Sequence, residues 1–350
     1  MKPKIPVTVL GATGTVGQKF LRLLAEHPWF EIAALAASDQ SAGQRYGEVV
    51  RWRENVPLAD RLADMTIARS APPLPGRIAF SALDADVAQE IEQKFAQCGA
   101  FVVTNTRIHR LDADVPLMIP EINANHLGLI ERQRAARGWP GAILANPNCS
   151  TAGLVLALAP LHAAFGVEKV FVTTLQAVSG AGYPGVPSLD ILGNVIPFIG
   201  GEEEKMERET AKILGALRNG VVEPAPMKIS AHCNRVATVD GHLETVSVGL
   251  GRRATPEQAI EVLRDFRGPD KVQGLPSSPA SPVVVDLRPD RPQTRLDLER
   301  GNGMSVTVGR VRPCPLLDLR LVLLSHNTIR GAAGAAVQIA ELLVVEGQVQ

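Results

Sequence analysis

The chain of 350 residues has no excess charge of either sign, because its 36 lysines and arginines are balanced by 36 aspartates and glutamates. Proteins that bind nucleic acids usually carry a basic surface, so this balance argues against that class of partner. Aromatic residues make up only 4% of the sequence, so a hydrophobic core must consist mainly of aliphatic side chains. With 45% hydrophobic and 21% charged residues, the composition is typical of a globular protein and argues against disorder.

Cysteine is also scarce: the sequence has four, at Cys98, Cys149, Cys233 and Cys314. None belongs to a C-x-x-C pair, so the spacing favours neither a zinc site nor a redox-active dithiol, and we expect no metal. The N-terminal segment has no apolar leader, and the longest strongly apolar stretch, 152–161, is about half of what a bilayer requires. We therefore expect a soluble, cytoplasmic protein.

Two hydrophobic patterns divide the chain. Up to about Asn148, short apolar segments alternate with helical ones, beginning with a predicted strand at Ile5–Leu10 and a predicted helix at 14–27. This alternation predicts an α/β domain with a parallel sheet. From Glu168 onward, longer alternating segments predict the strands of an α+β domain. These predicted strands are 170–177, 242–250, 305–312 and 317–324.

A glycine-rich turn, G-A-T-G-T-V-G, follows the first predicted strand and places Gly11, Gly14 and Gly17 at the start of the first predicted helix. Glycines let the backbone come close to a pyrophosphate, and a helix N-terminus offers free N–H groups to it. The turn therefore predicts a dinucleotide site. A tight turn between a strand and a helix also needs glycine for steric reasons alone.

The segment after the second predicted strand leaves the choice of dinucleotide open. Asp39 could accept a hydrogen bond from the ribose 2′-hydroxyl of NAD. Ser38 and Ser41, with Arg45 nearby, could instead donate hydrogen bonds to the 2′-phosphate of NADP. Equally, these residues could do no more than stabilise a loop.

The best candidate for a nucleophile is Cys149, in N-P-N-C-S-T between an apolar predicted strand, 142–144, and an apolar predicted helix, 153–161. This position puts its sulfur at or next to a helix N-terminus, which stabilises a thiolate. The same N–H groups could stabilise an oxyanion at a carbon that the sulfur attacks. We expect the other cysteines to be inert.

Several motifs occur together in the order known from one family. N-P-N-C-S-T, with LGATGTVGQ before it and TLQAVSGAG, EEEKMERET, RVATVDGH and HNTIRGAAG after it, resembles aspartate-semialdehyde dehydrogenases of the archaeal and fungal type. The resemblance runs almost from end to end. It implies an α/β fold with a Rossmann-type dinucleotide-binding domain at 1–149 and an α+β catalytic and dimerisation domain at 150–326. A C-terminal helix, 327–350, would return to the first domain.

The resemblance also implies roles for residues in these motifs. Cys149 would be the nucleophile, His242 the acid–base group, and Gln176 would position the substrate or thioacyl group. Arg235 would bind the substrate carboxylate. On their own, Glu202 and Lys205 of a charged helix are more typical of a solvated face. The resemblance places Arg110, Glu202, Lys205 and Asn148 at the substrate, and Gly11, Thr13, Gly14, Thr15, Val16, Gly17, Ser38, Ser41, Ser179, Gly180 and Asn327 at the cofactor.

The implied activity is the reductive dephosphorylation of L-4-aspartyl phosphate to L-aspartate 4-semialdehyde in the biosynthesis of lysine, diaminopimelate, threonine and methionine. NADP is the expected cofactor, with NAD not excluded, because the family's S-A-G-K segment ends here in Gln44. The enzyme would be a homodimer or homotetramer with small-molecule substrates. Two alternatives stay open: a malonyl-CoA reductase of the same branch, and a cofactor-sensing protein that has lost catalysis. N-acetylglutamyl-phosphate reductase is disfavoured because its cysteine and histidine motifs differ.

Overall fold

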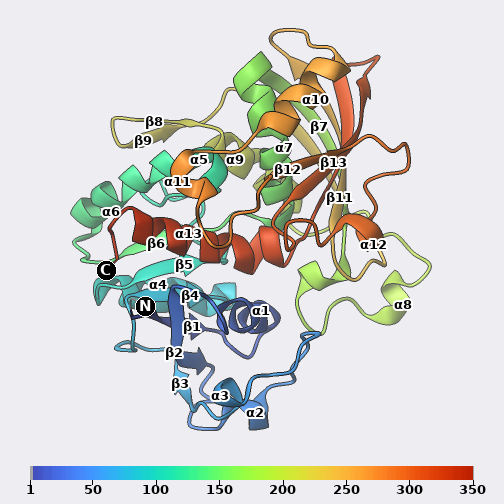
Figure 1. The fold of residues 1–350 in the computed structure, drawn as a ribbon. Coiled ribbons are helices and arrows are strands. Elements are labelled where there is room, and N and C mark those ends of the chain that lie inside the picture. Colours follow the sequence, from blue (N-terminus) through green and yellow to red (C-terminus); the bar gives the residue numbers. More distant parts are fainter. Residues whose placement is uncertain (1–2, 350) are drawn as a thin grey trace.

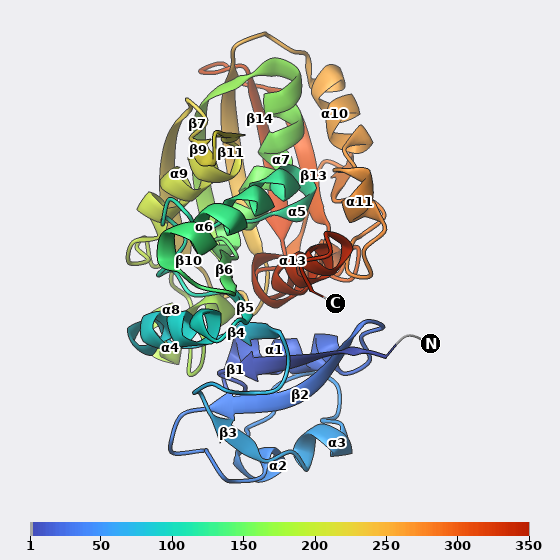
Figure 2. The ribbon, with the colours of Figure 1, turned by 90° about the vertical axis from the view of Figure 1, so that its left-hand side faces the viewer.

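The computed structural model describes residues 3–349, so the domain ends predicted at residues 1 and 350 lie outside the described part. Within the described residues, the strands form two six-stranded sheets and a two-stranded ribbon (Figure 1). The N-terminal sheet lies at one end of an elongated body and the second sheet at the other (Figure 2). The predicted class, an α/β protein with a dinucleotide-binding domain and a second domain, is confirmed.

The first sheet is entirely parallel, as its alternating sequence predicted. Its strand order is that of doubly wound dinucleotide-binding folds. Three of its strands are buried along their whole length, which explains why they read as continuous apolar runs. The order is β3 (Ile67–Arg69), β2 (Phe30–Ala37), β1 (Ile5–Leu10), β4 (Ile78–Ser81), β5 (Phe101–Thr104) and β6 (Ala142–Ala145).

Helices connect these strands. The first, α1 (Thr15–Leu24), links β1 to β2 and buries Phe20, Leu21 and Leu24 on one face. The second long one, α4 (Ala85–Gln97), links β4 to β5. The other helical segments of this half are α2 (Tyr46–Val49), α3 (Asp60–Ala63), α5 (Pro120–Asn123), η1 (Ala124–Gly128) and α6 (Leu129–Arg137).

The second sheet is mixed. Four of its strands agree with the prediction to within a few residues, whereas the first and last in the order below were not predicted. These two run parallel to their neighbours, and the other pairs are antiparallel. The order is β10 (Lys228–Arg235), β7 (Val167–Gln176), β11 (His242–Leu250), β14 (Leu319–Ser325), β13 (Val306–Pro313) and β12 (Val283–Asp286).

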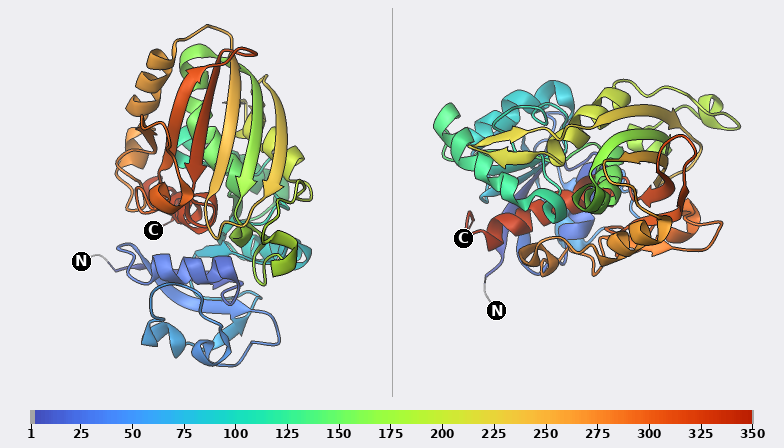
Figure 3. Two further views of the ribbon diagram at one scale, coloured as in Figure 1. Left: turned by 90° about the vertical axis from the view of Figure 1, so that its right-hand side faces the viewer. Right: turned by 90° about the horizontal axis from the view of Figure 1, so that it is seen from above.

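Three helices cover one face of this sheet: α7 (Cys149–Phe165), α9 (Glu202–Ile213) and α10 (Pro256–Asp265). The opposite face is turned toward the viewer in Figure 3 (left). No helix within residues 3–349 is both long and apolar enough to cross a membrane. Smaller elements are η2 (Val178–Ala181), α8 (Ser188–Ile191), α11 (Asp270–Gln273), α12 (Thr294–Asp297) and the ribbon β8 (Ala216–Arg218) with β9 (Val221–Glu223).

The C-terminal segment leads back to the first sheet. It begins as a π-helical turn, η3 (Ile329–Ala333), and continues as α13 (Gly334–Val345). The α13 helix packs against α1, β4 and β5, while η3 packs against α7 and α1. This segment therefore joins the two sheet layers at the point where α1 and α7 begin.

Candidate active site

Polar side chains from distant parts of the sequence meet at one edge of the second sheet, where β7 and β10 end and β11 begins. Arg235 lies opposite Gln176 in the register of β10 and β7. The register of β11 and β7 pairs Leu243 with Leu175, so His242 is next to Gln176. Arg235, Gln176 and His242 thus form one cross-strand row, although they are distant in sequence.

Cys149 is the first residue of α7, and the preceding residue caps this helix. The Asn148 side-chain oxygen accepts hydrogen bonds from the backbone N–H groups of Ser150 and Thr151, at 3.0 and 3.2 Å. The cap fixes the first turn of the helix next to the cross-strand row. As a result, the sulfur of Cys149 lies 3.1 Å from Nε2 of His242.

The backbone determines which nitrogen of His242 carries the proton. The Ala177 N–H donates to Nδ1 at 3.1 Å, so Nδ1 must be the unprotonated nitrogen. The neutral ring then carries its proton on Nε2, facing the sulfur of Cys149. Burial, assisted by the positive charge of Arg235, lowers the pKa of His242 to about 3. His242 is therefore neutral at ordinary pH and donates a hydrogen bond to the sulfur.

The charge balance around Cys149 favours the thiol in the free protein. Burial raises the pKa of Cys149 to about 12, and the carboxylate of Glu202 adds to this effect. The guanidinium groups of Arg110 and Arg235 act in the opposite direction. A cation that neutralised Glu202 would therefore make ionisation of the thiol easier.

Glu202 and Lys205 occupy the first turns of α9, which points into the site. Oε1 of Glu202 accepts from Nζ of Lys205 at 2.7 Å, and Oε2 accepts from Nδ2 of Asn148 at 2.7 Å. Burial opposes ionisation of Glu202, but Lys205 and the hydrogen bonds outweigh it and lower the pKa of Glu202. Only 7% of Glu202 is exposed, so this pair is not the solvated helix face that its sequence alone would suggest.

The two candidate anion-binding arginines are held by neighbouring groups. Nη1 of Arg110 donates to a carboxylate oxygen of Glu209 at 3.1 Å, and its Nη2 donates to the carbonyl of Asn105 at 2.8 Å. Nη1 of Arg235 donates to the carbonyl of Ala177 at 2.8 Å. Both guanidinium groups border the space in front of Cys149.

A cavity of about 490 Å³ contains most of the predicted site residues. His242 does not line the cavity, but its Nε2 contacts the sulfur of Cys149, which does. Gly180 is also constrained, because a Cβ there would lie 2.9 Å from Nη1 of Arg235. The predicted residues that line the cavity are Thr15, Val16, Arg110, Asn148, Cys149, Gln176, Ser179, Gly180, Glu202, Lys205, Arg235 and Asn327.

Eight lining residues were not predicted, among them Arg107, Thr328 and Gly331. Arg107 is exposed and is a second cation in the N-T-R-I-H-R motif that contains Arg110, which is a signal that could have identified it. Gly331 belongs to η3, and a Cβ at this position would lie 2.7 Å from Cβ of Cys149. That contact depends on the return of the C-terminal segment, and no local sequence pattern predicts it.

The start of α1 fits a pyrophosphate. Gly14, its N-cap residue, provides no side-chain cap, so the first-turn N–H groups are free to bind phosphate oxygens. Gly11 has φ +74°, and a Cβ there would lie 2.4 Å from the carbonyl oxygen of Ala82. At Gly17 a Cβ would lie 2.1 Å from the oxygen of Gly11, so this third glycine permits close packing of the helix on the strand.

A second cavity, of about 610 Å³, lies on the other side of the glycine turn and includes Gly11, Thr13 and Gly14. The glycine turn thus has one cavity on each side. A dinucleotide whose pyrophosphate lies at the turn could extend one end into this cavity and the other into the cavity at Cys149. Its far end is lined by Ser38 and Asp39, as predicted.

The expected contributions of Ser41 and Arg45 to this cavity are not found. Neither residue lines it, and Arg45 instead pairs with Asp64 at 3.5 Å on the surface. The cation at the cavity is Arg69, at the end of β3, whose Nε lies 3.6 Å from Asp39. The short strand β3 was not predicted, so its arginine could not be placed beside β2.

Glu244 is a buried carboxyl that the sequence analysis did not single out. It follows His242 by two residues, so both side chains point to the same face of β11. Neither of its carboxyl oxygens has a hydrogen-bond partner among the described residues. Burial therefore raises the pKa of Glu244 well above the ordinary value of 4.5, which favours the neutral acid.

We expect Glu244→Gln to make the protein less sensitive to rising pH. Because folding raises this pKa, the unfolded chain releases the proton first. Each pH unit between the ordinary and the folded pKa then costs the wild-type about 1.4 kcal/mol of unfolding free energy. Urea unfolding at pH 5, 6 and 7 should show this slope in the wild-type and a smaller one in the variant. Equal slopes would contradict it, and Glu261→Gln, at an exposed position of α10, is the control.

Comparisons with known proteins agree along the whole chain. Residues 6–130 match the family described as semialdehyde dehydrogenase, NAD binding domain, and residues 158–330 match semialdehyde dehydrogenase, dimerisation domain. The aspartate-semialdehyde dehydrogenase of Archaeoglobus fulgidus is 49% identical over 97% of this chain and 98% of its own.

Two solved structures extend these matches. Aspartate-semialdehyde dehydrogenase with NADP from Candida albicans has a TM-score of 0.92 at 42% identity, over 99% of this chain and 100% of that one. Aspartate-semialdehyde dehydrogenase II complexed with ASA from Vibrio cholerae has a TM-score of 0.75 at 29% identity, over 98% and 99% of the two chains. The similarity thus includes both an archaeal and a fungal protein.

Proposed function

The chain belongs to the aspartate-semialdehyde dehydrogenases, a family of oxidoreductases, and we propose that it works through a thioacyl bond to Cys149. The single observation that carries this proposal is the position of the Cys149 sulfur at the start of α7, 3.1 Å from Nε2 of His242. A sulfur in this place has N–H donors around it and a proton-bearing imidazole in front of it. The reaction is the reduction of L-4-aspartyl phosphate to L-aspartate 4-semialdehyde and phosphate.

In the first half of the reaction, the sulfur of Cys149 attacks the acyl carbon of aspartyl phosphate. A C–S bond forms, the bond from carbon to the phosphate oxygen breaks, and phosphate leaves with the thiol proton. Nε2–H of His242 stabilises the developing negative charge on sulfur. The backbone N–H of Cys149, which neither the Asn148 cap nor Glu209 engages, is available to the carbonyl oxygen. Two easier steps then replace one difficult displacement.

In the second half, the thioacyl group is reduced. Reduced NADP, held at the glycine turn by Gly11, Gly14 and the first-turn N–H groups of α1, would supply the hydride for this reduction. The sulfur of Cys149 then leaves as a thiolate, the carbonyl re-forms, and the thiolate takes up a proton. His242 stabilises this leaving thiolate through the same hydrogen bond. Its neutral, Nε2-protonated form restricts the expected acid–base role to hydrogen-bond donation.

The charged groups around the cavity match the charges of the substrate. Arg235 is placed to bind the α-carboxylate, because its planar fork suits two oxygens. Glu202 is placed to accept the α-ammonium group, and this would also reduce its opposing effect on the ionisation of Cys149. Arg110, Arg107 and Lys205 are positively charged groups available to the phosphate. Gln176, in the cross-strand row, donates from its side-chain amide to Oε2 of Glu202 at 3.4 Å and would orient the acyl group.

Two further features belong to the proposal. NADP is the cofactor, because Arg69 and Ser38 at the end of the second cavity suit a 2′-phosphate and the Candida albicans relative is described with NADP. The chain forms a homo-oligomer through the face of the second sheet that α7, α9 and α10 leave uncovered. Phe171 of β7 is 46% exposed on the chain and packs against His232 at a ring distance of 5.4 Å.

The proposal is tested by a steady-state assay in the oxidative direction, with aspartate semialdehyde, phosphate and either NADP or NAD. We expect phosphate-dependent reduction of NADP, a lower rate with NAD, and no oxidation of NADPH by malonyl-CoA. Malonyl-CoA has no ammonium group to pair with Glu202, which favours aspartyl phosphate as the acyl donor. A faster reaction with malonyl-CoA than with aspartyl substrates would refute the assignment. The absence of any turnover would favour a sensor.

A further inference from the structure

The α9 helix carries four charged residues at helical spacing: Glu202, Lys205, Glu209 and Lys212. Their spacing of three, four and three residues places them on one stripe of the helix. Such an alternating stripe usually lies in solvent, yet 1% of Glu209 and 8% of Lys212 are exposed. The first two residues belong to the site already described, and the second two extend the stripe by two further turns.

Glu209 connects α9 to both the nucleophile and the proposed phosphate-binding arginine. Its Oε2 accepts from the backbone N–H of Asn148, beside Cys149, at 2.6 Å. Its Oε1 accepts from Nη1 of Arg110 at 3.1 Å. A single carboxylate thus determines the distance between the start of α7 and the guanidinium of Arg110.

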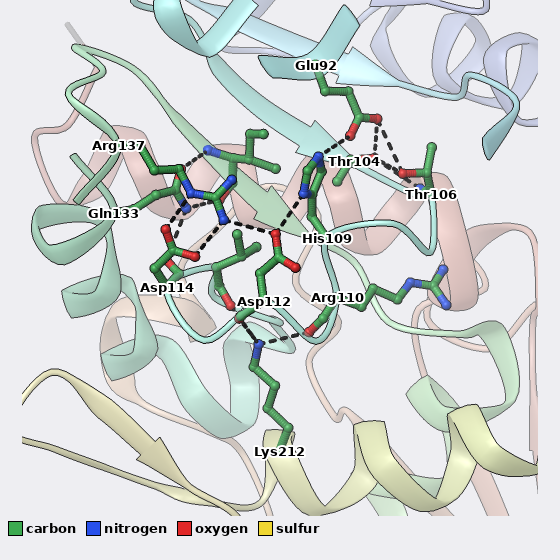
Figure 4. A network of polar contacts seen from close by, with 12 residues as sticks. Glu92, Thr104, Thr106, His109, Arg110, Asp112, Asp114, Gln133, Arg137 and Lys212 are labelled. Atoms are coloured by element: carbon green, nitrogen blue, oxygen red, sulfur yellow. Dashed lines mark hydrogen bonds and ion pairs between the residues drawn. The ribbon is translucent and has the colours of Figure 1, made fainter. Parts of the chain in front are cut away.

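Lys212 holds the backbone of the same arginine. Its ammonium group donates to the carbonyls of Arg110, Asp112 and Val115 at 2.8, 2.7 and 2.8 Å, as Figure 4 shows in part. Three carbonyl acceptors use all three N–H donors of a lysine. The segment 105–115 has no regular hydrogen-bonded ladder, so its conformation depends on contacts of this kind.

The other side of the segment 105–115 is held by side chains of the first domain. Nδ1 of His109 lies 2.9 Å from Oδ2 of Asp112, and its Nε2 lies 3.8 Å from Glu92 of α4. Arg137 of α6 pairs with Asp112 at 2.9 Å (Figure 4). The α9 helix contacts Arg110 itself at both ends, at its carbonyl through Lys212 and at its guanidinium through Glu209, where the carbonyl of Asn105 is a second acceptor.

We propose that Glu209 and Lys212 are positioning residues that hold Arg110 from both ends, so that the helix carrying Glu202 and Lys205 also determines where the phosphate binds. The proposal rests on the assignment of Arg110 to the phosphate. In this arrangement α9 sets the distance between Glu202, which would bind the ammonium group of the substrate, and Arg110, which would bind its phosphate. A displaced Arg110 guanidinium would meet the phosphate oxygens with poorer hydrogen-bond distances and angles, which weakens binding.

The test is Lys212→Met, assayed with phosphate and aspartate semialdehyde varied in turn. We expect the KM for phosphate to rise about tenfold, with kcat and the KM for aspartate semialdehyde within about twofold of the wild-type. Lys94→Met, which removes an exposed ion pair of α4, is the matched control and should change neither KM. If all three constants of Lys212→Met change together, or none does, the proposal is wrong.

A double-mutant cycle separates positioning from a general structural effect. Because Lys212 acts through Arg110, Lys212→Met should not raise the KM for phosphate further in an Arg110→Ala background. Independent, multiplying effects would overturn the proposal. If Arg110→Ala alone leaves this KM unchanged, the assignment of Arg110 to phosphate fails instead. Should Lys212→Met not fold, Lys212→Gln, which keeps two N–H donors, replaces it in the cycle, with a smaller expected increase and the same two criteria.

Discussion

Cys149→Ala is expected to lower kcat by at least about four orders of magnitude, because the variant has no atom that can form the thioacyl bond. The affinity for NADPH should stay within about twofold, since Cys149 is not part of the glycine turn that holds the pyrophosphate. Steady-state assays measure the first effect, and titration of NADPH fluorescence measures the second. The two readouts together separate loss of the nucleophile from loss of the fold.

Cys98→Ala is the matched control, because Cys98 is a free and exposed cysteine outside the site. It should retain the activity of the wild-type. A Cys149→Ala enzyme with a substantial fraction of wild-type turnover would show that the sulfur is not the nucleophile. A combined loss of turnover and of NADPH binding would show that the substitution disrupts more than the chemical step.

His242→Gln is expected to lower kcat by about two to three orders of magnitude, the range found when one preorganised hydrogen-bond donor to a developing negative charge is removed. The affinity for NADPH should change little. Since the pKa of His242 is lowered to about 3, its imidazole is uncharged throughout the range in which the enzyme is assayed. The pH profile of wild-type kcat/KM should therefore show no acid limb near the ordinary imidazole pKa.

The control for this prediction is His162→Gln, in the last turn of α7, at the opposite end of that helix from Cys149. It should leave both kcat and the pH profile unchanged. An acid limb near pH 6.5 in the wild-type, lost in His242→Gln, would mean that the imidazole titrates in the free enzyme. That result would contradict the tautomer deduced from the Ala177 N–H group.

Much of the site could be predicted because its residues lie in local motifs. The glycine turn and the helix start beside Cys149 depend only on neighbouring residues. The glycine turn is found where the sequence placed it, and Cys149 is the first residue of α7, four residues before the predicted helix. The strands β1 and β11 also begin and end at the predicted residues. In contrast, β3 and β10 were not predicted, since pairing with neighbouring strands rather than a clear alternating pattern defines them.

The cation at the far end of the second cavity is Arg69 and not Arg45, the arginine that the sequence suggested. Arg45 follows β2 closely in sequence but points to Asp64 on the surface. Arg69 reaches the cavity because β3 pairs with β2 in a register that sets Arg69 beside Ala37. Strand register depends on pairing across the sheet, and single-sequence reasoning did not find this pairing.

The sequence by itself determined the class of fold, the glycine turn and the cysteine at a helix start, because each depends on periodicity or on adjacent residues. Only the tertiary structure decided which charges are buried and what they hold. Glu202, Glu209 and Lys212 form a stripe that would be solvated on an isolated helix. They are buried because α9 packs between α7 and the segment of Arg110, where unpaired charges would be costly and each finds a partner. The same packing gives His242 its tautomer, since the N–H group that specifies it belongs to Ala177, 65 residues away.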